Sequence, residues 1–295
     1  MSERISRAIL GGAVTLMVAI GAIGCDDGGT GAGGSGGSGG SGGAGAAGGG
    51  GSGGSGGTGS TGATGGGGSG GSGGSGGGEK AEFAALVRGP LFTADMAEAK
   101  TQHDTIAAAG EATAKAAGDH AHTVLLGTTL LGTTENGFLA MDRWDDPMSM
   151  KTFYENPDFQ AAFATLFSAP PTLENFQRRP EWHTWGTIES GEPFDPYYWV
   201  VVRGHLAEAD PAKAQAAHDA VAAGGEAQVT AAGDLAHVVF TGLADPQEFL
   251  AVDVWKSTDN MEAVYTNPDF QAAFGALFDG PPTVVVHEST DWHQW

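Results

Sequence analysis

The stretch YENPDFQAAF at residues 154–163 recurs almost unchanged as YTNPDFQAAF at residues 265–274. Two such similar segments, roughly a hundred residues apart, indicate an internal duplication. In each segment Asn suits a helix N-cap, Pro fits the first helical position, and Asp lies in the electropositive first turn. The motif therefore predicts a helix start in each copy, and capping explains it without a catalytic role.

The duplication extends through the whole second part of the chain. Three further pairs of segments match: HD at 103–104 and 218–219, FLAMDRW at 138–144 and FLAVDVW at 249–255, and WHTW at 182–185 and WHQW at 292–295. We therefore divide this part into two units, residues 79–190 and residues 191–295.

The sequence of each unit predicts an α+β fold. In the second copy we expect strands at 198–206, 237–241, 248–255 and 283–288. A helix capped by Asp210 follows the first strand, and Gly224-Gly225 should break or bend it. A second helix lies between the last two strands and restarts at Asn267-Pro268. The order β-α-β-β-α-β is the ferredoxin-like pattern. It leaves one apolar sheet face open, so we expect the two units to pack face to face as a monomeric, intrachain pseudo-dimer.

At this point residues 83–295 resemble the dimeric α+β barrel superfamily, and most closely its antibiotic-biosynthesis-monooxygenase-like members. The resemblance rests on the element order, on the Phe-x-Ala-x-Asp-x-Trp strand and on the Tyr-x-Asn-Pro-Asp-Phe segment. It implies a fold shared by cofactor-free oxygenases, haem-degrading enzymes, isomerases and proteins without a known reaction. We expect no bound cofactor in this chain.

The N-terminal residues predict export and a lipid anchor. Residues 1–24 have a basic start and an apolar core that is short for a membrane span, which is typical of a signal peptide. The ending AIGC at 22–25 resembles the lipobox of bacterial lipoproteins, which implies lipidation of Cys25 with diacylglycerol and palmitate. The alternative is an uncleaved membrane anchor with an incidental cysteine.

Residues 25–78 complete this tether. From residue 28 they contain only Gly, Ser, Ala and Thr, a composition that predicts a disordered linker. We expect the protein in the bacterial cell envelope, attached to a membrane, on its periplasmic or outer side.

The composition limits the possible partners. The chain has 13 Lys and Arg against 35 Asp and Glu, a net charge of −22, which argues against nucleic-acid binding. A single cysteine also precludes an intramolecular disulfide.

Repeated polar and aromatic residues are the candidates for a small-molecule pocket. They are His103, His122, Asp142, Trp144, Tyr154 and their repeats His218, His237, Asp253, Trp255, Tyr265. His103 and His218 lie on apolar helix stripes, where they could be a base or ligand in a cavity between helix and sheet, or core histidines satisfied by a neighbour. His122 and His237 begin a strand, where they could instead satisfy a turn.

The aspartates share a strand face with tryptophans, because strand side chains alternate. A carboxylate among aromatic rings has a raised pKa unless it is paired, and Arg88 or Arg203 on the first strands could pair with it. The tyrosines could bond a ligand, or pack in the core with a solvated hydroxyl. The repeated Trp-His-x-Trp segments could close a pocket or seal the interface between units.

A metal site is not expected. His120 and His122 would face the same way on a strand, but Leu235 replaces the first histidine in the second copy. Three functions remain: a small-molecule-binding protein, a cofactor-independent monooxygenase-like enzyme with His103 and His218 or the strand aspartates as bases, and a structural or protein-interaction module. The first two require a cavity among the candidate residues, whereas the third predicts solid packing.

Overall fold

The computed structural model describes residues 82–132, 137–188 and 197–295. The first unit contains β1 (Phe83–Gly89), α1 (Met96–Ala117), β2 (Asp119–Gly127), a short 3-10 turn η1 (Leu130–Gly132), β3 (Phe138–Trp144), α2 (Pro147–Tyr154), α3 (Pro157–Ala164) and β4 (Thr172–Arg178). The second contains β5 (Tyr198–His205), α4 (Pro211–Ala232), β6 (Asp234–Gly242), β7 (Glu248–Trp255), α5 (Thr258–Tyr265), α6 (Pro268–Gly275) and β8 (Thr283–Ser289). Both units therefore have the predicted ferredoxin-like order.

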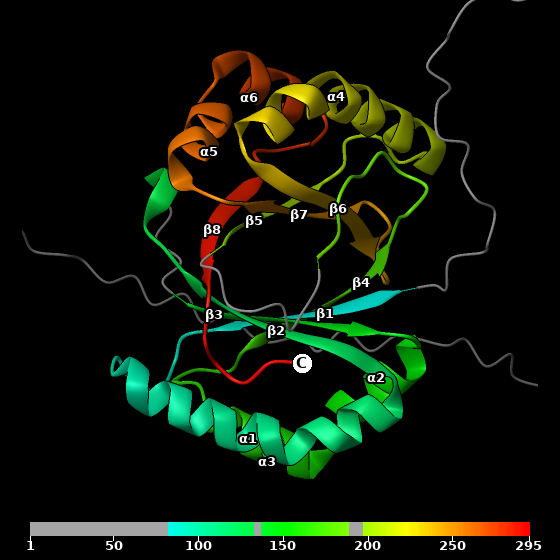
Figure 1. Cartoon of the computed structure of the whole chain (residues 1–295). Helices are drawn as coiled ribbons and strands as arrows, with labels where there is room; N and C mark the ends of the chain where they lie inside the picture. Colours follow the sequence, from blue (N-terminus) through cyan, green and yellow to red (C-terminus); the bar gives the residue numbers. More distant parts are fainter. Residues whose placement is uncertain (1–81, 133–136, 189–196) are drawn as a thin grey trace, which may run out of the picture. The chain divides into compact units, whose positions relative to one another are not determined.

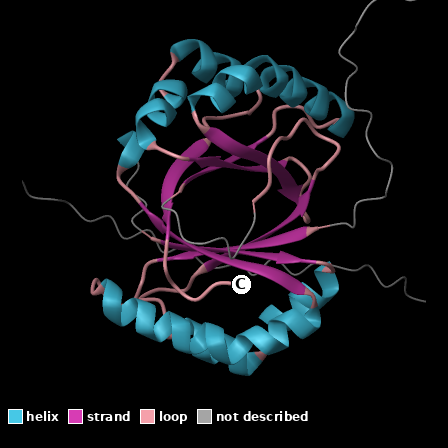
Figure 2. Ribbon diagram, in the orientation of Figure 1, coloured by secondary structure: helices cyan, strands magenta, loops and turns pink. Residues whose placement is uncertain are grey.

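The strands form one closed barrel in the order β1-β3-β2-β8-β5-β7-β6-β4, with every neighbouring pair antiparallel. The two units join at β2–β8, where Leu125 pairs with Ser289, and at β4–β6, where Phe176 pairs with Gly242. Helices of each unit cover the outer face of its own strands (Figures 1 and 2). The predicted intrachain pseudo-dimer is thus confirmed as a closed α+β barrel.

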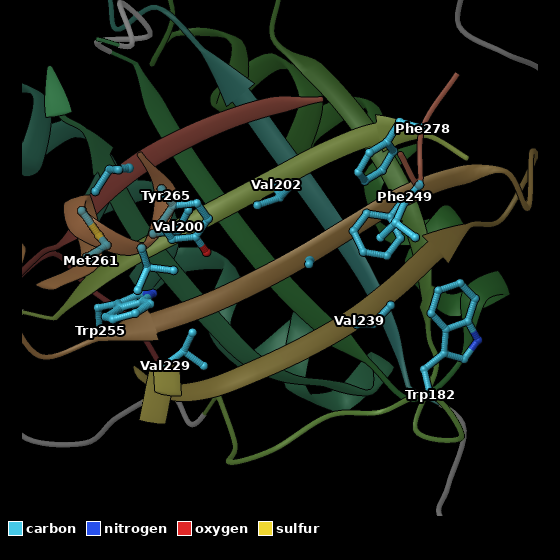
Figure 3. Close-up of a cluster of buried hydrophobic side chains, with 14 of the residues drawn as sticks. Trp182, Val200, Val202, Val229, Val239, Phe249, Trp255, Met261, Tyr265 and Phe278 are labelled. Atoms are coloured by element: carbon cyan, nitrogen blue, oxygen red, sulfur yellow. The ribbon is translucent and has the colours of Figure 1, made fainter. Parts of the chain in front are cut away.

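Buried apolar side chains form three clusters, one inside the barrel and two outside it. Inside it, Leu86, Leu139, Phe240 and Leu250 are almost fully buried in one cluster. A second and a third cluster lie between each helical layer and its strands. Figure 3 shows the cluster of the second unit, with aromatic residues toward both ends of the sheet. Alternation along each strand places one set of side chains in the barrel and the other under the helices.

Local capping signals behave as expected in α3 and α6. The side chain of Asn156 accepts hydrogen bonds from the N–H groups of Asp158 and Phe159, and Asn267 does the same in the second unit. The expected break at Gly224-Gly225 is wrong, because α4 runs through both glycines as a 22-residue helix. The Asp210 cap at its start and the left-handed Gly233 at its end hold the helix despite the low propensity of glycine.

Several predictions concern residues outside the described ones. These are the signal peptide, the lipidated Cys25, the Gly/Ser linker and the boundary between the units at residues 190 and 191. Within the described ranges, no helix combines the length and apolar character that crossing a bilayer requires.

Candidate functional site

Each unit has a cavity between its sheet and its own helices, outside the barrel interior. The cavity of the second unit measures about 50 Å³ and that of the first about 40 Å³. Both have mostly apolar walls, with equivalent polar side chains at one side. In the second unit these are His218, Asp234, His237, Asp253 and Tyr265.

A continuous chain of hydrogen bonds links four of these polar residues, all except Asp234, in the second unit. The Tyr265 hydroxyl donates to Asp253 Oδ2, and Asp253 Oδ1 lies 2.5 Å from His237 Nδ1. His237 Nε2 lies 3.1 Å from His218 Nε2, and His218 Nδ1 lies 3.0 Å from Asp219 Oδ1. The chain begins at a buried hydroxyl and ends at a carboxylate whose side chain is 31% exposed.

The first unit repeats this chain with equivalent residues. Tyr154 donates to Asp142 Oδ2, Asp142 Oδ1 bonds His122 Nδ1, and His122 Nε2 lies 3.2 Å from His103 Nε2. His103 Nδ1 then lies 3.0 Å from Asp104 Oδ1. Sheet register explains the central pair, because His122 and Asp142 are directly opposite on β2 and β3 and share the helix-facing side.

The protonation of His103 follows from its burial. Burial, followed by the neighbouring His122, lowers the pKa of His103 to about 4. At neutral pH His103 is therefore a neutral ring, and its single N–H serves one of its two contacts, with Asp104 or with His122.

His103 and His218 have both ring nitrogens engaged, which changes their predicted role. Burial, as the largest cause, also lowers the pKa of His218 to about 4. A neutral ring that accepts at one nitrogen and donates at the other can pass a proton along the chain. These histidines therefore fit a relay better than a base in direct contact with a ligand.

A second buried carboxyl group lines each cavity. Burial, followed by the neighbouring Asp142, raises the pKa of Asp119 to about 9, and burial followed by Asp253 raises that of Asp234 to about 8. Both stand at an irregularity in the strand register, typical of a β-bulge that redirects a side chain. At neutral pH these carboxyls are protonated, so each cavity contains a potential hydrogen-bond donor.

The C-terminal segment of the first unit covers the site of the second unit. We call residues 182–185 the first strap. Trp182 lies with its ring 5.0 Å from that of His218, and Trp185 stacks 4.6 Å from His237. The backbone N–H of His183 donates to Asp219 Oδ1 at 2.7 Å, the same oxygen that His218 contacts.

The second strap, residues 292–295, covers the site of the first unit in the same way, and Figure 1 shows the C-terminal end beside β1 and β2. Trp292 lies 5.1 Å from His103, and Trp295 stacks 4.5 Å from His122. The N–H of His293 donates to Asp104 Oδ1 at 2.7 Å. Each site is therefore completed by residues from the other half of the sequence.

The structure brings nearly all candidate residues together. Trp144 is the exception, because it is fully buried against Phe153 and Tyr154 and does not line the first cavity. The hydroxyls of Tyr154 and Tyr265 are buried and donate hydrogen bonds to Asp142 and Asp253, so the expectation of solvated hydroxyls is wrong.

Two other expected contacts are replaced. Arg88 bonds Glu174 through Nε at 3.0 Å and Arg203 Nη1 lies 3.6 Å from the same carboxylate, so neither arginine pairs with Asp142 or Asp253. These arginines occupy the alternate face of β1 and β5, directed into the barrel.

His120 does not share the side of His122, because the bulge interrupts alternation and leaves His120 exposed near Asp145. No group of three or more His, Cys, Asp or Glu within residues 82–132, 137–188 and 197–295 could hold a metal ion.

Sequence reasoning missed four acidic members of the two sites: Asp104, Asp119, Asp219 and Asp234. Two signals could have found them. Both copies carry an His-Asp pair in the first helix and a Gly-Asp pair before the second strand. Sequence alone indicates only a turn at the Gly-Asp pair, because the proximity of its aspartate to Asp142 or Asp253 depends on strand pairing.

Comparison with known proteins agrees with this architecture. Residues 200–276, from β5 to α6, match the antibiotic biosynthesis monooxygenase family, and the chain thus carries such a domain in its second unit. No curated protein sequence matches the chain.

The fold has a counterpart among solved structures. A putative monooxygenase from Fusobacterium nucleatum is similar at a TM-score of 0.53 and 9% identity, covering 72% of this chain and 93% of its own. A putative monooxygenase from Lactobacillus acidophilus is similar at a TM-score of 0.47 and 10% identity, covering 71% and 93%.

Proposed function

With an antibiotic biosynthesis monooxygenase domain at residues 200–276 as the premise, we propose that each unit binds a small molecule between its sheet and its helices. The observation that carries this proposal is the pair of cavities, each lined by the same chain of Tyr, Asp and His. Apolar walls with a few convergent polar groups are typical of a ligand site.

The lining indicates the chemistry of the ligand. In the second unit the walls include Val221, Phe270, Phe274 and Leu277, which favour a flat, mainly apolar body. The protonated Asp234 favours a ligand oxygen that accepts a hydrogen bond. A small aromatic compound with one carbonyl or hydroxyl group combines these properties.

Filling the cavities tests this proposal. We expect members of a panel of small phenols and aromatic ketones to raise the melting temperature of the wild type. The double variant Ala107→Leu/Ala222→Leu should lose this shift, because both alanines line the cavities. The matched control Ala223→Leu changes an exposed position of the same helix and should keep it. Equal shifts in all three proteins, or no shift in the wild type, would contradict binding at these cavities.

The hydrogen-bonded chain favours a second candidate, a cofactor-independent monooxygenase-like reaction. A substrate CH₂ group next to the polar side of the cavity would lose a proton to the Asp–His side of the chain. His103 or His218 would relay a proton to the half-exposed Asp104 or Asp219. O₂ would then take four electrons in all from the substrate carbon, one oxygen atom forming the product carbonyl and the other leaving as water with the two hydrogens of the CH₂ group.

Breaking the relay tests the enzymatic candidate. His103→Gln/His218→Gln should abolish O₂ consumption with any panel compound that the wild type oxidises. Circular dichroism and the thermal shift by that compound should remain, because glutamine fills a similar volume and the other lining residues are unchanged. Retained O₂ consumption in the variant would exclude the relay from the reaction.

We also propose that the protein is a lipoprotein of the bacterial envelope. The support is the resemblance of residues 22–25 to a lipobox and the Gly/Ser spacer that follows. Wild-type protein expressed in bacteria should incorporate labelled palmitate and sediment with membranes, and Cys25→Ser should do neither. Labelling of the serine variant would contradict this assignment.

A further inference from the structure

The two long helices that cover the sites each contain a glycine at an equivalent interior position. These are Gly110 in α1 and Gly225 in α4, and both helices continue for 22 residues without interruption. Glycine weakens a helix interior relative to alanine, because it loses more backbone entropy on folding. A glycine in such a place therefore calls for a physical reason.

Packing inside the protein does not supply that reason. A Cβ atom added at Gly110 or Gly225 would meet no heavy atom within 4 Å. The contrast with strand glycines is clear, since a Cβ at Gly204 would lie 2.5 Å from the Phe278 ring and one at Gly89 would lie 2.7 Å from Phe167. The strand glycines are required by neighbouring rings, whereas the helix glycines face open space.

That open space is next to the cavity. Gly110 lines the cavity of the first unit and Gly225 that of the second, and both residues are half-buried. The following residue, Glu226, holds His183 of the first strap at 2.9 Å, so strap and helix meet beside the glycine. Gly224, one position earlier, is exposed and is not part of the cavity wall.

We propose that Gly110 and Gly225 are ligand contacts, where the ligand packs against bare helix backbone in the space that a side chain would fill. This inference rests on the proposed binding function and adds a shape requirement to it. The ligand must have a thin, mainly apolar edge or face directed at the helix, opposite the polar group that Asp119 or Asp234 contacts. Any side chain at these glycines would compete with the ligand for the cavity.

The test compares two neighbouring glycines with xenon as the probe, because xenon enters small apolar cavities without needing a specific hydrogen bond. We expect Gly110→Ala/Gly225→Ala to bind xenon about tenfold more weakly than the wild type, as followed by xenon NMR. Gly224→Ala should bind xenon normally. Both proteins should unfold at a higher urea concentration than the wild type, since alanine favours the helix.

A larger substitution makes the result decisive. Gly225→Leu should remove xenon from the second site, and Gly224→Leu should not. Equal xenon affinity in the Gly225→Leu and Gly224→Leu proteins would overturn the inference. The cavity-filling test with phenols and ketones remains independent, because it asks whether ligands bind at all and leaves both glycines unchanged.

Discussion

Tyr265 shows how much a single hydroxyl contributes at the residue scale. Its O–H satisfies Asp253 in a buried region, while His237 satisfies the other carboxylate oxygen. A buried carboxylate that loses one donor keeps its desolvation cost without compensation. The hydrogen-bonded chain is therefore a stability element as well as a candidate relay.

Tyr265→Phe should consequently lower the free energy of unfolding by about 1–3 kcal/mol. Urea denaturation at neutral pH measures this difference. The control Tyr198→Phe changes a half-buried tyrosine whose hydroxyl has no hydrogen bond to the described residues, and it should be nearly neutral. Similar losses in both variants would show that ring packing, and not the Asp253 contact, determines the effect.

The buried carboxyls Asp119 and Asp234 predict a specific pH dependence. Their folded-state pKa values of about 9 and about 8 exceed the ordinary value of 3.8, so the unfolded chain releases these protons first. Stability must therefore fall as pH rises toward 8–9. The lowered pKa values of His103 and His218 act in the opposite direction, but only between about 4 and 6.5.

Between pH 6.5 and 8.5 only the carboxyl contribution remains among these four groups. Asp119→Asn/Asp234→Asn should flatten the decline in stability over this window, because Asn stays neutral and can still accept from the backbone N–H. Urea midpoints at pH 6.5 and 8.5 test it. An unchanged decline would place the responsible proton elsewhere.

At the scale of elements, the sequence predicted what local signals encode. Helix starts at Asn156 and Asn267 follow from capping, and strand order follows from alternation and turns. The continuity of α4 through Gly224-Gly225 did not follow, because packing over 22 residues outweighs local propensity. The site was only half predictable, since His122 meets Asp142 through strand register, which no local pattern specifies.

The helices α2 and α5 make the two sites unequal. Phe153 of α2 lines the first cavity, whereas Val264 occupies the equivalent position in the second. Phe153 also packs on Phe159 at 4.5 Å between ring centroids, which narrows the helical side of the first site. The larger second cavity is consistent with the smaller side chain.

Exchanging these side chains should exchange the ligand size limits. Phe153→Val should allow compounds that bind only the second site of the wild type to bind the first site as well. It should also lower the free energy of unfolding by about 1–2 kcal/mol. Val264→Phe should exclude them from the second site. Binding stoichiometry by calorimetry would show the change, and unchanged stoichiometry in both variants would assign the difference to other residues.

At the scale of the whole molecule, the two straps couple the halves of the chain. The crossing was not predictable from the repeat, because a tandem sequence gives the same pattern whether each Trp-His-x-Trp segment returns to its own unit or to the other. The contacts of Trp185 with His237 and of Trp295 with His122 settle which occurs.

A strap substitution should therefore act on the opposite half. Trp185→Ala, although in the first unit by sequence, should speed amide exchange in α4 and β6 of the second unit by about tenfold. Trp295→Ala should do so in α1 and β2. Each variant is the control for the other, and faster exchange confined to the substituted half would contradict the crossing.

The crossed straps also impose an order on folding as the chain emerges, N-terminus first, from the ribosome or from the export machinery. Residues 182–185 emerge before the unit that they cover, so the second site has every part available as soon as its own unit has emerged. The first site must wait for residues 292–295, more than a hundred positions after β4, with its histidines uncovered in the interval. Two chemically matched sites thus mature on different schedules, and the earlier-made half spends longer vulnerable to misfolding and proteolysis.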